Sequence, residues 1–222
     1  MTRLLALAAI FASGIGGYAL WTASQSPNAG PSLAAYAQDA DAEVDLSLVT
    51  EMSLGNPDAD VTVVEYASFT CPHCKTFHEG PFKELKADYI DTGKIHFIYR
   101  EVYFDRFGLW AGMIARCAGE MRYFGVVDML YDGQRDWIGD GQDPVAISER
   151  LKTIGKSAGM SQDEVDACMT NADLAQAMVA VYQQNAEDDN VRSTPSLLVN
   201  GEPLSGNSYA ELKATIDQEL GS

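Results

Sequence analysis

The segment Cys71-Pro72-His73-Cys74 places two thiols two residues apart. Thiols at this spacing can open and close as one reversible disulfide, so the pattern indicates redox chemistry before any other. Residues 61 to 69, which precede it, are typical of a strand, whereas residues 75 to 89 carry helix formers with apolar side chains at helical spacing. The cysteine pair is therefore expected at a strand-to-helix junction.

This junction would favour the ionised form of Cys71. At the start of a helix, free backbone N–H groups and the positive end of the macrodipole stabilise a thiolate more than a thiol. Pro72 suits the first helical turn, since its missing N–H would have no partner inside the helix. His73 adds a hydrogen-bond donor beside the sulfur, and a cation when protonated. We expect a lowered pKa at Cys71, a disulfide that is readily given away, and Cys74 as the resolving partner.

Three alternatives to the redox interpretation were open. Structural zinc would need a second ligand pair at comparable spacing, but Cys117 and Cys168 are isolated in the sequence. A chaperone that binds Cu(I) through Cys71 and Cys74 would need a third well-placed soft ligand. A permanent structural disulfide between Cys71 and Cys74 would have no redox activity. The redox interpretation is preferred, and it requires no metal or organic cofactor because the sulfur atoms carry the electrons.

Residues 1 to 24 predict export from the cytosol. An uncharged, mostly apolar run extends from Leu4 to Trp21, at the lower edge of the length that spans a membrane. Small residues follow it, so a cleaved signal peptide is favoured over a retained membrane anchor. Residues 25 to 43 are rich in small and polar residues and indicate a flexible linker. The folded part is expected in the periplasm, where thiol oxidation is useful.

The composition is strongly acidic. The 222 residues carry 15 basic and 32 acidic side chains, a formal net charge of −17. This balance argues against binding to nucleic acid or to an anionic membrane surface, and the solubility of an exported protein explains it sufficiently.

Hydrophobic periodicity predicts an α/β chain that is interrupted by helices. Residues 94 to 99 alternate as a second strand, parallel to the first across a right-handed βαβ unit. Gly80-Pro81 predicts a break in the intervening helix. Near the C-terminus, residues 196 to 205 indicate a hairpin around Asn200-Gly201, followed by a helix at residues 209 to 220.

The region between the two halves shows no strand pattern. Helical spacing predicts helices at residues 110–131, 144–158, 161–169 and 172–185. Ser161 and Glu164 have the spacing of a capping box at the start of the third of these helices.

Taken together, these features resemble the DsbA-type thiol:disulfide oxidoreductases of the thioredoxin superfamily. The resemblance covers residues 50 to 220 and rests on the Cys-Pro-His-Cys segment, its strand context, the helical interruption and Thr194-Pro195 before the hairpin. It implies a thioredoxin fold, with a thioredoxin-like domain at residues 44–106 and 186–222 and an all-helical insertion at residues 107–185.

The same resemblance implies a function and partners. Pro195 is expected to be a cis proline beside the active-site disulfide, with Thr194 offering backbone groups to a bound peptide. The expected activity is donation of the Cys71-Cys74 disulfide to reduced, unfolded exported proteins, with reoxidation by a quinone-linked membrane partner of DsbB type. The protein is expected to act as a monomer. A reductase or isomerase on the same fold is the alternative, although such isomerases usually add a dimerisation domain.

Glu65 is anomalous because a central strand of a parallel sheet should be apolar on both faces. The resemblance places an acid here beneath the second cysteine, where Glu65 would help Cys74 lose or regain its proton. An edge-strand carboxylate that faces water is the alternative.

Cys117 and Cys168 lie in the helical region, and the simplest members of the family lack this pair. We interpret them as a second, structural disulfide. Two separately buried thiols, or a shuttle that passes oxidation from Cys71 to Cys117, are the alternatives.

Overall fold

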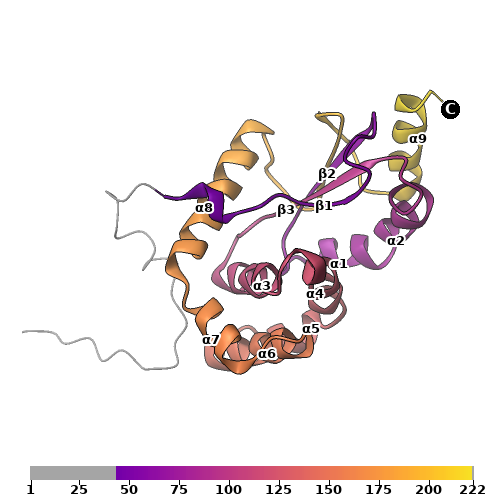
Figure 1. Cartoon of the computed structure of the whole chain (residues 1–222). Helices are drawn as coiled ribbons and strands as arrows, with labels where there is room; N and C mark the ends of the chain where they lie inside the picture. The colour runs from indigo at the N-terminus through magenta and orange to yellow at the C-terminus, as the bar shows by residue number, and fades with distance from the viewer. Residues whose placement is uncertain (1–43, 222) are drawn as a thin grey trace, which may run out of the picture.

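The computed structural model describes residues 44–221, and the expected export signal and linker lie outside this part. A mixed five-stranded sheet carries helices on both faces (Figure 1). Its strands are β1 (Met52–Gly55), β2 (Thr62–Ala67), β3 (His96–Glu101), β4 (Ser196–Val199) and β5 (Glu202–Pro203).

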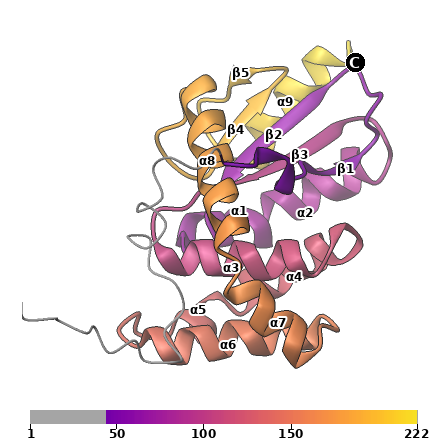
Figure 2. The same cartoon turned by 60° about the vertical axis from the view of Figure 1, so that its left-hand side comes forward.

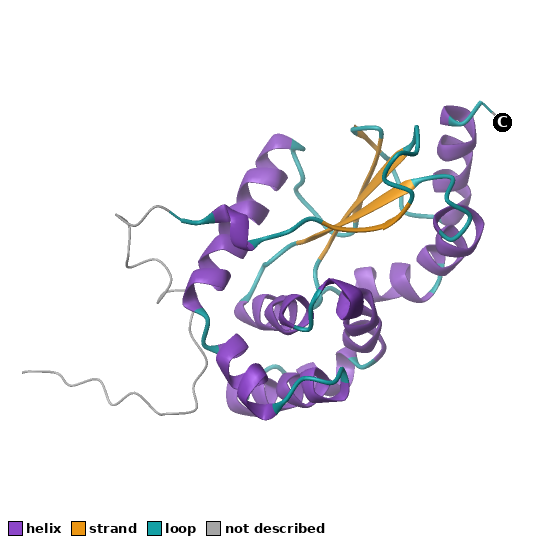
Figure 3. Cartoon of the chain, viewed as in Figure 1, coloured by secondary structure: helices purple, strands orange, loops and turns teal. Residues whose placement is uncertain are grey.

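Helices account for most of the remaining described residues (Figure 3). The α-helices are α1 (Pro72–Glu79), α2 (Pro81–Leu85), α3 (Arg106–Cys117), α4 (Glu120–Asp132), α5 (Gln134–Ile138), α6 (Pro144–Ser157), α7 (Gln162–Met169), α8 (Ala172–Asp188) and α9 (Tyr209–Glu219). A short 3₁₀ helix, η1 (Leu46–Leu48), precedes β1, and a π-helical turn, η2 (Lys86–Ile90), follows α2. None of the helices in residues 44–221 has the length and apolar character needed to cross a bilayer.

The sheet has the order β1-β3-β2-β4-β5. β2 and β3 pair in parallel, which confirms the predicted βαβ unit, and the other three pairings are antiparallel. The sequence prediction missed β1, a four-residue edge strand. The predicted hairpin is confirmed: Asn200 (φ 51°) and Gly201 (φ 84°) both have positive φ, as a tight two-residue turn requires.

The first helix breaks where Gly80-Pro81 predicts. α1 ends at Glu79, and Pro81 begins α2, because proline cannot supply the N–H that would continue the α1 hydrogen-bond ladder.

Helices α3 to α7 form the insertion, in which α3 packs against α4, α6 and α7. Figure 2 shows α3 and α4 between the sheet and the outer pair α6 and α7. The single predicted helix at residues 110–131 is wrong: α3 and α4 are separated at Ala118 and Gly119, whose φ of 87° ends the α3 conformation. The capping box of Ser161 and Glu164 is confirmed at α7.

The two faces of the sheet are covered differently. Side chains such as Val63 and Phe97 face α1, α2 and α9 and join the main core, which continues into the insertion. Val64, Tyr66 and Ile98 face the other way, against Tyr182 of α8. The arrangement confirms an α/β thioredoxin fold interrupted by an all-helical insertion. The expected boundary at residue 185 falls within α8, which packs on the sheet and ends at Asp188.

Candidate active site

The two cysteines of the motif lie where β2 ends and α1 begins. Cys71 is the residue before α1, with extended backbone angles (φ −82°, ψ 120°), and Pro72 occupies the first helical position. Cys71 is half-buried, Cys74 is fully buried, and both are free thiols. One sulfur is therefore reachable and the other is enclosed one turn further along.

The loop before β4 meets this pair from the side. The Thr194-Pro195 peptide bond is cis, as the resemblance implies, and the Cys71 thiol donates to the Thr194 carbonyl oxygen, with the sulfur 3.6 Å away. The Thr194 hydroxyl is buried without a hydrogen-bond partner among residues 44–221. The geometry thus brings Thr194 and Pro195 to the motif across more than a hundred residues of chain.

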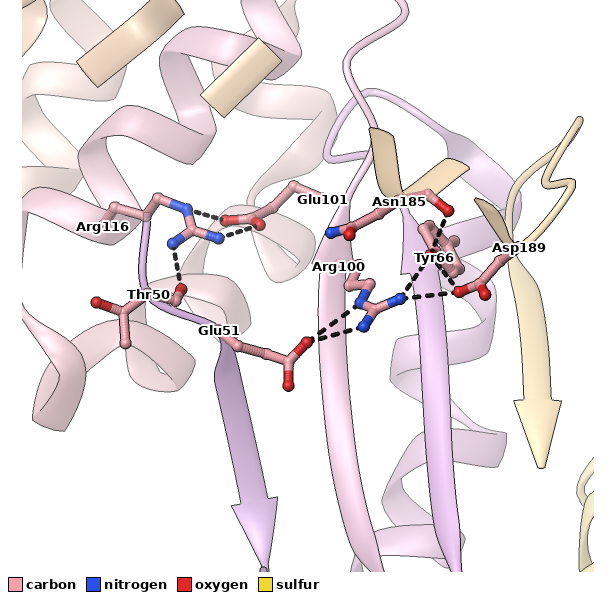
Figure 4. Close-up of polar contacts among 8 residues, drawn as sticks. All are labelled: Thr50, Glu51, Tyr66, Arg100, Glu101, Arg116, Asn185 and Asp189. Atoms are coloured by element: carbon pink, nitrogen blue, oxygen red, sulfur yellow. Dashed lines mark hydrogen bonds and ion pairs between the residues drawn. The ribbon is translucent and has the colours of Figure 1, made fainter. Parts of the chain in front are cut away.

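A polar network holds the end of α8, from which this loop departs (Figure 4). Arg100 Nη1 donates to Asp189 Oδ2 over 2.8 Å, and the Tyr66 hydroxyl donates to the same oxygen over 2.5 Å. Arg100 also pairs with Glu51 over 2.9 Å. Since Tyr66 and Arg100 are neighbours on β2 and β3, the sheet itself fixes the start of the loop.

The surroundings of Cys71 favour its thiolate. Partial burial raises its pKa, but the polar groups of Thr194, Cys74 and the His73 backbone around the sulfur outweigh this, and the net pKa lies below the usual value. The backbone of His73 contributes to this lowering, and its imidazole is exposed.

Cys74 and Glu65, in contrast to Cys71, have raised pKa values, so their neutral forms are favoured. Burial, with a smaller contribution from the charge of Glu65, raises the pKa of Cys74 well above that of a free thiol. Burial also raises the pKa of Glu65 to about 8. Both carboxyl oxygens of Glu65 are buried with no hydrogen-bond partner among the described residues. The reactive thiol and the resolving thiol are thus electrostatically distinct.

Glu65 lies in the middle of the sheet. Its Cα partners are Tyr99 on β3 and Leu197 on β4, so the alternative of a solvent-facing edge strand is wrong. The hydroxyls of Tyr99 and Tyr131 lie 2.7 Å apart in the same buried region. No local pattern indicates this tyrosine pair, because the two residues are 32 positions apart in the chain and meet only in the fold.

Two polar side chains, one directly before the insertion and one within it, hold the active-site loop, and neither was predicted as a site residue. Asp105 caps α3 by accepting from the N–H groups of Phe107 and Gly108, and Thr70 donates to its second oxygen over 2.6 Å. Aspartate is a preferred N-cap residue, so its position directly before a helix could have predicted this role. Gln134 donates to the carbonyl oxygens of Phe69 and Cys71.

Asp105→Ala should destabilise the protein by about 1–2 kcal/mol, because two backbone N–H groups at the start of α3 lose their acceptor. Urea unfolding measures the loss. Asp143→Ala is the matched control, since Asp143 caps α6 through two N–H groups in the same way. The two variants should lose similar stability, but only Asp105→Ala should also change the reactivity of Cys71. Equal reactivity in both would contradict a link through Thr70.

The other two cysteines form a disulfide between the end of α3 and α7, with a Cα–Cα distance of 6.1 Å. The alternative of two separate thiols is therefore wrong. Because the other end of α3 contacts the active-site loop and a 12-residue helix is about 18 Å long, Cys117 lies far from Cys71. A direct shuttle between them has no geometric support.

Within residues 44–221, no group of three or more His, Cys, Asp or Glu side chains is arranged to hold a metal ion. In particular, Cys71 and Cys74 form no such group with a third histidine, cysteine or carboxylate among these residues.

Comparison with known proteins agrees with this geometry. A thioredoxin family model matches residues 47–218. A Rickettsia bellii protein, provisionally named a protein-disulfide oxidoreductase, is 34% identical over 174 residues, which cover 77% of this chain and 64% of the relative. Disulfide bond formation protein D of Bacillus subtilis is 28% identical, with 75% of this chain and 76% of the relative covered. The chain thus spans less than two thirds of the length of the rickettsial relative.

Solved structures share the fold. Alpha-DsbA1 of Wolbachia pipientis superposes with a TM-score of 0.71 at 25% identity, covering 78% of this chain and 92% of its own. A protein-disulfide isomerase of Novosphingobium aromaticivorans gives a TM-score of 0.71 at 26% identity, with coverage of 78% and 98%. The chain therefore belongs to the thioredoxin family, among its members of DsbA type.

Proposed function

We propose that this protein is an extracytoplasmic thiol:disulfide oxidoreductase, which donates its Cys71-Cys74 disulfide to reduced, unfolded exported proteins. One observation carries the proposal: a half-buried thiol of lowered pKa sits at the start of α1, directly beside a buried thiol of raised pKa. The named activities of the DsbA-type relatives support it.

The reaction is dithiol–disulfide exchange. A substrate thiolate attacks the Cys71 sulfur, because that sulfur is the reachable end of the bridge; a mixed disulfide forms and Cys74 leaves. A second substrate thiolate then attacks the substrate sulfur of the mixed disulfide, and Cys71 departs as a stabilised thiolate. Two electrons pass from the substrate dithiol to the enzyme, and the substrate gains the disulfide.

Glu65 has a proton to give at the first step. With a pKa of about 8 it is protonated at neutral pH, while the high pKa of Cys74 makes its thiolate a strong base when it leaves. Glu65 would therefore hand a proton to Cys74 and recover one during reoxidation. Thr194 and Pro195, beside the Cys71 sulfur, would position the substrate backbone.

The setting of this chemistry is part of the proposal. The apolar N-terminal run supports export to the periplasm by a cleaved signal peptide. A quinone-linked membrane protein of DsbB type would reoxidise the dithiol, and the enzyme would act as a monomer without a bound cofactor.

A disulfide reductase or isomerase on the same fold is the second candidate, because one of the similar structures is named an isomerase. An oxidase and a reductase differ in reduction potential: an oxidase stays largely reduced in glutathione buffers that leave a reductase oxidised.

Equilibration with defined glutathione buffers tests the proposal. The reduction potential of the Cys71-Cys74 couple should lie well above that of thioredoxin, at about −270 mV, and closer to about −120 mV. A potential at or below the thioredoxin value would contradict the oxidase assignment and favour a reducing role.

A further inference from the structure

Gln134 directs both of its amide hydrogens at the active-site loop. It is the first residue of α5 and is 3% exposed. Its Nε2 donates to the carbonyl oxygen of Phe69 over 2.8 Å and to that of Cys71 over 2.9 Å. A buried side chain of the insertion thus binds the backbone on both sides of Thr70.

A second set of hydrogen bonds runs in the opposite direction. Lys75, on the first turn of α1, donates through Nζ to the carbonyl oxygens of Tyr131 and Asp132, over 2.6 and 3.1 Å. Both carbonyls lie at the end of α4, which only Gly133 separates from Gln134. Donors from each segment therefore meet acceptors on the other, which fixes the α4–α5 junction against the motif.

Of the four carbonyl groups that accept these hydrogen bonds, that of Cys71 belongs to the same residue as the reactive sulfur. Its oxygen already accepts the Lys75 N–H over 3.2 Å, and Gln134 supplies a second donor. A donor to this carbonyl offsets the negative end of its dipole beside the thiolate, and it orients the peptide that carries Cys71 at the start of α1.

We propose that Gln134 is a positioning residue that fixes the backbone around Cys71 and so sets the reactivity of its sulfur. The proposal rests on the proposed function, since it assigns to the insertion a part in preparing the nucleophile. Packing alone does not explain why a glutamine occupies this buried position. Methionine would fill the same space and has no amide hydrogens that need acceptors.

The test is the pH dependence of Cys71 alkylation in the reduced full-length protein. Gln134→Met keeps the shape and removes both donors, and the apparent pKa of Cys71 should rise by roughly 0.5–1 unit. Gln134→Glu keeps at most one of the two donors and, where its carboxyl ionises, adds a negative charge that faces two carbonyl oxygens, so the apparent pKa of Cys71 should again rise. The exposed Gln142 of the same insertion provides the control, because Gln142→Met should leave the apparent pKa unchanged.

The outcomes separate a positioning role from a structural one. If both Gln134 variants fold, lose stability and still alkylate with the wild-type pH profile, the proposal is overturned. The glutamate variant decides where the methionine variant does not fold, because its protonated carboxyl still donates one hydrogen bond at low pH. A free-thiol profile in the wild-type protein would instead contradict the proposed function itself.

Discussion

Cys71→Ser should abolish disulfide donation to a reduced model protein, a loss of roughly a thousandfold or more. The reason is chemical: the exchange passes through the Cys71 sulfur, and a serine oxygen can form neither the enzyme disulfide nor the mixed disulfide. The rate at which a reduced, unfolded substrate regains its disulfide and activity measures the effect.

Cys74→Ser is the matched control, because it removes the other sulfur of the same bridge. Its Cys71 thiolate can still attack a disulfide, but nothing remains to resolve the product, so mixed disulfides should accumulate and be visible on non-reducing gels. Residual oxidation in Cys71→Ser, or the absence of adducts in Cys74→Ser, would contradict the assigned roles.

Glu65→Gln should stabilise the reduced protein at neutral pH. The pKa of Glu65 is about 8 in the fold and near 4.5 when unfolded, so between these values the folded state binds more protons than the unfolded state. Stability therefore falls as the pH rises through this window, and glutamine removes that dependence. The gain should be near zero at pH 4 and about 3 kcal/mol at pH 7.

Denaturant unfolding at several pH values measures this gain. The control is Glu101→Gln, a second buried glutamate on the neighbouring strand. Glu101 pairs with Arg116 over 2.6 Å and accepts from the Tyr123 hydroxyl, so its loss leaves a buried cation unpaired and should cost about 3 kcal/mol. The same glutamate-to-glutamine substitution should thus stabilise the protein at Glu65 and destabilise it at Glu101. Destabilisation of Glu65→Gln at pH 7 would mean that the carboxylate has a partner in solution.

Local signals in the sequence were sufficient for much of the fold. The βαβ unit follows from the alternation around β2 and β3, and the hairpin from Asn200-Gly201. The signals failed where structure depends on distant partners. β1 is only four residues long and is held by pairing with β3 across more than 40 residues, and the break after α3 depends on a single glycine, Gly119, within an otherwise helical pattern.

The candidate site divides in the same way. Cys71 and Cys74 are recognisable from spacing alone, and Glu65 from its charge within an apolar strand. Thr194 was found only by resemblance. Gln134 carries no local signal: its role exists because the insertion folds back onto the loop of Cys71, and no property of its neighbours in sequence indicates this.

Calorimetric unfolding of the two redox forms at pH 7, with the Cys117–Cys168 bridge intact, tests the central claim most directly. A Cys71 thiolate that the fold stabilises must make the dithiol form the more stable one, because the same free energy makes the disulfide a strong oxidant. We therefore predict that the dithiol protein melts at the higher temperature. An oxidised protein that melts at the same or a higher temperature would contradict this account.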